Sequence, residues 1–242
     1  MEKLTNEQRQ VLLSGILGDG HLKNGRAIFS CIHKEYMELK KKLLGDLSLL
    51  VERKQNSGFK KDAFIYKLGT LAHPEIKEME KYSTKRILEE IDELGIALWI
   101  ADDGSRHKKN NFYNINTHAL PRYEEEQHLL PFFNSIGIFP RITTETKKDG
   151  RCFSYLYIPK WEGAMELSRI LRKLELNCYD YKLMPIEMEE AYFRNKDLEE
   201  FKMANSYGRT KIIKNGMGLT YKDILHKNVT STEMRITNSA NI

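Results

Sequence analysis

Apolar and small residues at helical spacing form two short stretches, and each stretch stops at an Asp-Gly pair. The stretches are LLSGILGDG over residues 12–20 and IALWIADDG over residues 96–104. A glycine directly after an apolar run is a typical stop signal for a helix. The pattern therefore predicts two short helices that each end with an aspartate, Asp19 in the first and Asp103 in the second.

Capping, periodicity and turn residues predict the elements around the first stretch. Thr5 and Gln8 form a capping box where its helix begins. Residues 27–32 predict a strand, and residues 63–68 are the second of two extended segments that flank a turn at 56–58. A helix between the strand and the turn is predicted from apolar residues at helical spacing, which are Tyr36, Leu39, Leu43, Leu47 and Leu50.

The same order of elements returns after the second Asp-Gly pair. Residues 112–117 predict a strand, and a helix begins at Pro121. Residues 141–146 and 153–158 predict a hairpin around the turn at 149–150. The apolar faces of this helix and of a closing helix are Leu129, Phe132, Phe133 and Ile136, and Leu167, Ile170, Leu171 and Leu174.

The recurrence indicates a duplicated unit, with Asp19 and Asp103 displaced by 84 residues. We predict a first repeat at 1–92, a second at 93–204 and an extension at 205–242. Small residues on the two Asp-ended helices allow close packing along a shared seam; they are Ser14, Gly15, Gly18, Ala97 and Ala101. If the two helices run side by side in the same sense, their carboxylates meet at one end, where oxygen ligands can hold divalent cations.

Composition narrows the class of protein without naming a function. The chain has 242 residues, of which 40% are hydrophobic and 30% charged, as expected for a soluble globular protein. No apolar stretch approaches the roughly 20 residues that span a bilayer, so we expect no membrane partner. Cys31, Cys152 and Cys178 show no metal-ligand or disulfide spacing. We expect a reducing, intracellular location, either the cytoplasm of a bacterium or phage-infected cell or an organelle matrix.

The net charge of +5 is unevenly distributed. The segment from Asn205 onward has six basic and two acidic residues, which leaves only +1 for the rest of the chain. A nearly neutral body argues against indiscriminate binding of polyanions, although a basic face balanced by an acidic back gives the same sum. The run Lys40–Lys42 is expected to be a solvated helix face, with a phosphate contact as the alternative.

The two Asp-Gly segments resemble the paired signature helices of the LAGLIDADG homing endonucleases in their monomeric, two-motif form. The resemblance covers roughly residues 4–204 and implies an α+β fold: a tandem pseudo-two-fold repeat with two antiparallel, saddle-shaped sheets and helices on the outer face. It also implies that Asp19 and Asp103 are catalytic metal ligands for Mg²⁺ or Mn²⁺. Gly18 and Asp102 are the neighbouring motif positions at the metal site, and Asp102 is either a hydrogen-bonding neighbour or an additional contributor.

The resemblance further implies a basic residue near the cleavage centre after the last helix of each repeat. Residues 84–87 and 181–185 look like these segments, which makes Lys85 and Lys182 the candidate catalytic bases or charge stabilisers. Pro185 completes the expected setting of Lys182, whereas no proline follows Lys85.

The implied partner is double-stranded DNA, with intron RNA as an alternative. Paired strands fit the major groove, where the base edges carry a distinguishable pattern. The candidate base-reading residues are Arg26, Ser30, Asn114 and Arg141. The sequence therefore predicts a monomeric, site-specific endonuclease that makes a metal-dependent double-strand break. An RNA maturase that assists splicing and a noncatalytic DNA-binding regulator are the alternatives.

Overall fold

The computed structural model describes residues 2–54, 64–107, 112–118, 120–146, 149–150, 152–159 and 161–205. The chain forms two compact units, Met1–Met184 and Pro185–Ile242. The first unit contains two four-stranded sheets, and the described part of the second contains the helix α9, Ile186–Asn205. The first unit thus ends before residue 204, where the sequence predicts the end of the second repeat. In the described residues, no helix is both long and apolar enough to cross a membrane.

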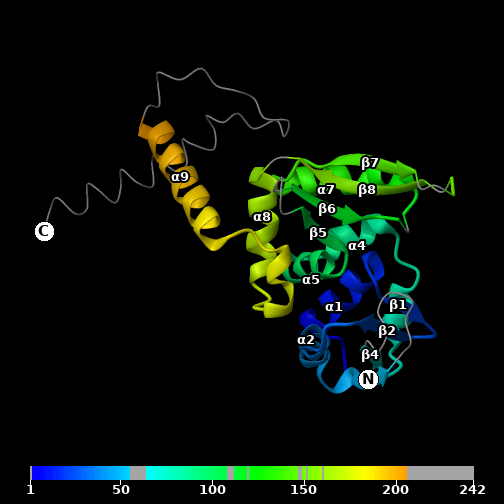
Figure 1. The fold of residues 1–242 in the computed structure, drawn as a ribbon. Helices are drawn as coiled ribbons and strands as arrows, with labels where there is room; N and C mark the ends of the chain where they lie inside the picture. Colours follow the sequence, from blue (N-terminus) through cyan, green and yellow to red (C-terminus); the bar gives the residue numbers. More distant parts are fainter. Residues whose placement is uncertain are drawn as a thin grey trace, which may run out of the picture. The chain divides into compact units, whose positions relative to one another are not determined.

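The first sheet and its helices follow the order expected for the first repeat (Figure 1). The strand order is β1-β2-β4-β3, with every neighbouring pair antiparallel. In chain order the elements are α1 Asn6–Leu17, β1 His21–Lys23, β2 Arg26–Cys31, α2 Lys34–Leu44, the 3-10 turn η1 Gly45–Leu47, β3 Ser48–Lys54, β4 Phe64–Thr70, α3 Pro74–Met79 and α4 Thr84–Glu90.

The second sheet repeats this topology as β5-β6-β8-β7, again with antiparallel neighbours. Its elements are α5 Glu93–Asp103, β5 Gly104–His107, β6 Phe112–Asn116, α6 Arg122–Glu124, the π turn η2 Glu125–Leu129, α7 Leu130–Ser135, β7 Arg141–Thr146, β8 Cys152–Ile158, α8 Trp161–Arg172 and the 3-10 turn η3 Asn177–Lys182. The α+β architecture with two equivalent antiparallel sheets is therefore confirmed.

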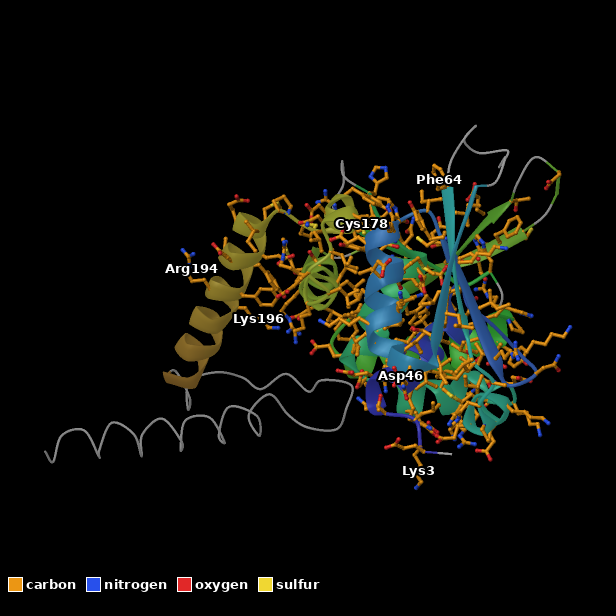
Figure 2. All side chains as sticks on the ribbon, turned by 90° about the horizontal axis from the view of Figure 1, so that it is seen from below. Lys3, Asp46, Phe64, Cys178, Arg194 and Lys196 are labelled. Carbon is orange, nitrogen blue, oxygen red and sulfur yellow. The ribbon has the colours of Figure 1, made fainter. Side chains whose placement is uncertain are left out.

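Each sheet has one face covered by helices and one face open. In β2, Ala27 and Phe29 are fully buried, whereas Arg26, Ile28 and Ser30 between them are exposed. This alternation follows from the two-residue period of a strand. Phe64 begins β4 at one end of the first sheet, and Asp46 lies in η1, just before β3, at the other end (Figure 2).

Two predicted helices end earlier than their apolar residues indicate. The helix predicted through Leu50 ends at Leu44, because Gly45 adopts a positive φ of 55° and η1 follows; Leu50 belongs to β3. Ile136 lies beyond the end of α7 and is exposed, so it does not belong to the buried face of that helix. The predicted turn at 56–58 lies outside the described residues, and the three cysteines are free.

The helices α1 and α5 lie side by side between the sheets and run in the same sense (Figure 1). At their first turns, Asn6 Nδ2 donates to Asp92 Oδ2 at 2.8 Å, and Asp92 caps α5. Gln10, which is buried, donates to the Glu90 carbonyl at 3.0 Å and accepts from the Asp92 amide at 2.9 Å. These bonds start both helices at the same level, so their carboxyl ends also lie together.

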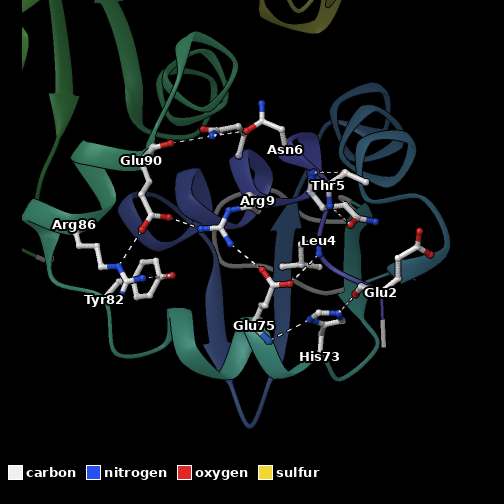
Figure 3. A network of polar contacts seen from close by, with 12 residues as sticks. Glu2, Leu4, Thr5, Asn6, Arg9, His73, Glu75, Tyr82, Arg86 and Glu90 are labelled. Carbon is white, nitrogen blue, oxygen red and sulfur yellow. Dashed lines mark hydrogen bonds and ion pairs between the residues drawn. The ribbon is translucent and has the colours of Figure 1, made fainter.

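A polar network fixes the surrounding helices to the first half of α1 (Figure 3). Arg9 Nη1 donates to Glu75 of α3 at 2.9 Å, and Arg9 Nη2 forms an ion pair with Glu90 of α4. Glu90 also accepts from Arg86 Nε at 3.0 Å, and Glu75 accepts from the Leu4 amide at 3.0 Å. The helix α4 is thereby held beside the amino-terminal half of α1.

Candidate active site

The two Asp-Gly motifs meet where α1 and α5 end. A Cβ placed on Gly18 lies 2.9 Å from Asp103 Oδ2 and 3.1 Å from Asp102 Cβ, so only glycine allows this close approach. The Gly20 amide donates to the Gly15 carbonyl at 2.9 Å, which turns the chain sharply after Asp19. The small residues predicted for the seam therefore bring the two acidic ends into contact.

The electrostatics of these ends show that the carboxylates lie close together. Burial raises the pKa of Asp103 to about 8, and the charges of Asp19 and Asp102 act in the same direction. Exclusion of water also raises the pKa of Asp19, and Asp102 adds to this effect. The positive charges of Lys40 and Lys182 oppose the rise at Asp19. Like charges are thus held together, and positive charge is needed beside them.

Lys40 supplies one of these positive charges from α2 in the first repeat. Its side chain is 1% exposed, and Nζ donates to Asp102 Oδ1 at 3.1 Å and to Oδ2 at 2.9 Å. The ammonium also lies over the rings of Phe29 and Tyr36, at 4.7 Å and 4.5 Å from their centroids. This buried ion pair connects the first repeat to the second.

The prediction of a solvated face for Lys40–Lys42 is therefore wrong for Lys40, although Lys41 and Lys42 are exposed. Lys40 follows Tyr36 by four residues and precedes Leu44 by four, and both of these are buried. A helix places residues at this spacing on one face. The spacing of Lys40 from the apolar residues Tyr36 and Leu44 is the signal in the sequence that identifies it as a lysine facing the core.

Lys182 supplies the second positive charge from η3. It is buried, and its Nζ donates to the Ala101 carbonyl and, at 3.4 Å, to the Ile100 carbonyl, the last turn of α5. A cation at this end of a helix interacts favourably with the helix dipole. Burial lowers the pKa of Lys182 to about 8, against the attraction of Asp102 and Asp103. The structure thus places Lys182 beside the acidic ends.

Comparison with known protein families decides the family of this chain. A model of the LAGLIDADG DNA endonuclease family matches residues 9–164. The chain belongs to this family. Its two LAGLIDADG segments are therefore residues 12–20 and 96–104. No curated protein sequence matches the chain significantly.

Solved structures of LAGLIDADG proteins are similar to this chain at low sequence identity. The homing endonuclease I-WcaI, solved bound to its DNA recognition sequence, is 19% identical over 76% of this chain and 85% of that chain, with a TM-score of 0.55. The N-terminal LAGLIDADG domain of DUF199/WhiA is 14% identical, with 72% and 90% coverage and a TM-score of 0.48. I-DmoI in complex with DNA and Mn is 14% identical, with 69% and 98% coverage and a TM-score of 0.42.

The structure does not bring Lys85 to the LAGLIDADG aspartates. Lys85 lies on α4 with 66% of its side chain exposed, and its Nζ is 3.7 Å from Glu89. The adjacent Arg86 joins the network around Arg9 of α1. Arg9 precedes Asp19 by ten residues, so the network that holds α4 lies about 15 Å along α1 from Asp19. Lys40, which the sequence interpretation missed, lies beside the acidic ends instead.

The residues at the acidic ends differ in their ability to hold a metal. Asp19 has exposed surface although neighbouring residues exclude part of the water around its carboxyl, and Asp103 is partly buried. Both have carboxylate oxygens of the kind that Mg²⁺ and Mn²⁺ prefer. Asp102 has both oxygens bound to Lys40, which favours the role of hydrogen-bonding neighbour. Gly18 has no side chain, which allows the end of α1 to lie close to Asp102 and Asp103. The described residues contain no group of three or more His, Cys, Asp or Glu arranged to hold a metal ion.

The four candidate base-reading residues lie on the open faces of the two sheets. Arg26 and Ser30 are exposed on β2 of the first sheet. Asn114 of β6 and Arg141 of β7 both pair with Tyr157 of β8, so they flank it on the second sheet. The structure thus places two of these residues on each sheet, and their contact with DNA stays a prediction.

Proposed function

We propose that this LAGLIDADG protein is a site-specific homing endonuclease that hydrolyses one phosphodiester bond in each strand of a long DNA target. The observation that supports this most is the meeting of Asp19 and Asp103, one from each repeat, at the end of a shared helix seam. A duplex has two antiparallel strands related by a two-fold axis. A duplicated scaffold with one carboxylate per repeat matches that symmetry.

The residues at the acidic ends fit divalent cations. Burial raises the pKa of both carboxyls, and the charge of Asp19 adds to the rise at Asp103, so a cation between or beside them favours their charged forms. We infer that these two carboxylates hold Mg²⁺ or Mn²⁺. Such ions, when bound, stabilise the attacking and leaving oxygens of phosphoryl transfer.

The buried lysines have separate roles in this proposal. Lys182 sits against the last carbonyls of α5, and its pKa of about 8 allows it to hold or release a proton near neutral pH. Lys40 neutralises Asp102, so that this third carboxylate does not add an uncompensated charge beside Asp19. Lys182 is thus the candidate for proton handling, and Lys40 is a positioning residue.

The open sheet faces are the proposed DNA-binding surface. Each sheet has an open face, and basic or amide side chains such as Arg26, Asn114 and Arg141 lie on these faces rather than in the core. Paired strands fit the major groove of DNA, where the base edges are read. The structurally similar I-WcaI was solved bound to DNA. Both repeats keep their aspartate, and lysines lie beside the two carboxylates. This favours an endonuclease over a maturase or a noncatalytic regulator, since nucleic-acid binding alone does not need the two aspartates.

Cleavage of a plasmid library that carries randomised inserts tests this function. The protein is expected to linearise a subset of plasmids in Mg²⁺, and Asp19→Asn or Asp103→Asn is expected to abolish cleavage while DNA binding persists. Asp46→Asn is the matched control, because Asp46 is exposed in η1 (Figure 2) and lies beside the start of α1, at the opposite end of that helix from Asp19. Full cleavage by either site variant, or no cleavage by the wild-type protein, contradicts the proposal.

A further inference from the structure

The open faces of the two sheets carry different chemistry at equivalent positions. His21 and Ser105 each lie two residues after the aspartate of their motif, which aligns the two sheets residue by residue. Across the first sheet, the row of paired residues is His21, Ile28, Gly69 and Leu49. Across the second sheet, the equivalent row is Ser105, Asn114, Tyr157 and Arg141.

The row on the first sheet is an exposed apolar patch. Ile28 is 49% exposed and Leu49 is 54% exposed, and Gly69 lies between them. Neighbouring strands are about 4.8 Å apart, so the two aliphatic side chains flank a slot about 10 Å wide at its base. A Cβ on Gly69 has only the Leu49 carbonyl within reach, at 3.9 Å, so the slot is open. The open face of the first sheet therefore offers two aliphatic side chains for apolar contact.

Basic residues border this patch on both sides. Arg26 lies two residues before Ile28 on β2, and Lys67 lies two residues before Gly69 on β4, so both share the open face. A hollow of about 680 Å³ adjoins Ile28 and is lined by His21, Lys23, Asn24, Arg26, Ile28 and Ala72. An apolar centre with a cationic border complements a groove of DNA, in which phosphates border the base edges.

The equivalent row on the second sheet is polar. Asn114 takes the place of Ile28, and its Oδ1 is buried with no hydrogen-bond partner in the described residues. Arg141 takes the place of Leu49 and is exposed. A buried amide oxygen without a partner is unfavourable unless a ligand supplies a donor.

We propose that the two halves of the DNA target are read by different chemistry: Ile28 and Leu49 contact thymine methyl groups, whereas Asn114 and Arg141 hydrogen-bond to purine edges. This inference rests on the proposed function. In the major groove only thymine presents a methyl group, which apolar side chains contact. Asparagine pairs with the N6 and N7 atoms of adenine, and arginine with the O6 and N7 atoms of guanine. Asn114 Oδ1 is enclosed in the free protein, so contact with the N6 amino group of adenine requires the amide to turn toward the groove.

Replacement of single atoms in the DNA tests this assignment. The wild-type protein binds a target recovered from the randomised library, without Mg²⁺ so that no cleavage occurs. Deoxyuridine replaces thymidine in one half-site at a time. Each contacted methyl is expected to contribute about fourfold in affinity, as burial of one methyl-sized group implies. The loss is expected in one half-site only, and replacement of purines by 7-deazapurines is expected to weaken binding through the other.

Protein variants assign each half-site to a sheet. Ile28→Ser with Leu49→Ser is expected to abolish the preference for thymidine over deoxyuridine, and Arg141→Lys to reduce the 7-deazaguanine effect because lysine cannot form the bidentate contact. Ile136→Ser, an exposed apolar position outside both sheets, is the matched control. Equal effects of deoxyuridine in both half-sites, or none in either, overturn the inference while leaving the endonuclease proposal intact. Failure of the wild-type protein to bind any target selectively overturns the proposed function itself.

Discussion

Lys40→Met is expected to destabilise the protein strongly, because it leaves Asp102 buried without its counter-charge. The two side chains are 1% and 4% exposed, and Lys40 Nζ donates to both oxygens of the Asp102 carboxylate. Breaking a buried pair by removing one partner costs about 3–5 kcal/mol. We expect urea unfolding at pH 7.5, without divalent cations, to show a loss of this size in the free energy of unfolding.

Two further variants separate loss of the pair from loss of packing. Lys40→Met with Asp102→Asn removes both charges, and it is expected to recover most of the lost stability, because no uncompensated charge remains. Lys42→Met removes an exposed lysine from the same helix and is expected to change stability by less than about 0.5 kcal/mol. An ordinary mutation costs about 1 kcal/mol. The reasoning is refuted if the free energy of unfolding of Lys40→Met lies within about 1 kcal/mol of the wild-type value. It is also refuted if the double variant is as unstable as the single one.

Two more predictions concern the acidic ends and the lysines. Asp103→Asn is expected to stabilise the metal-free protein, and the gain is expected to grow as the pH rises from about 4 to about 8. The carboxyl of Asp103 loses its proton near pH 4 in the unfolded chain, but its pKa of about 8 keeps it protonated in the folded protein. The wild-type protein therefore loses stability over this pH range, whereas the variant does not. Thermal unfolding at pH 5 and pH 8 measures this, and a melting temperature at pH 8 equal to or below that of the wild type contradicts it. Lys182→Met is expected to slow single-turnover cleavage by at least about a hundredfold with little change in DNA affinity, because a group that transfers a proton in the reaction contributes about 10²–10⁴-fold to the rate. Lys85→Met is expected to leave the rate unchanged, and the reverse ranking of these two variants would restore the role that sequence resemblance assigns to Lys85.

The sequence predicts the positions of the two aspartates because local signals determine them. An apolar run, small residues and an Asp-Gly stop define each helix end, and the duplication implies that Asp19 and Asp103 meet. Lys182 was also predictable, since its short segment resembles a family pattern. For these residues the local sequence and the final geometry agree.

The lysine of the first repeat could not be assigned from local sequence, because its position depends on tertiary packing. Lys40 belongs to a run of three lysines, and only the register against Tyr36 and Leu44 distinguishes the one that faces inward. Lys85 looked equivalent to Lys182, but α4 packs against the opposite half of α1. The early end of α2 depends on one residue, Gly45, whose backbone conformation interrupts an otherwise continuous apolar pattern.

The bonds from Gln10 to the chain at Glu90 and Asp92 set the alignment of the two acidic ends from the far end of the helix pair. A chimera that joins one repeat of this protein to a repeat of a relative must therefore keep Gln10 and a compatible pair of side chains at positions 6 and 92, even if every residue on the open sheet faces is retained. A mismatch there would slide one helix along the other, and a slip of one residue moves its carboxylate by about 1.5 Å. Whether the two halves can be exchanged thus depends on residues that lie about 13 Å along α1 from Asp19.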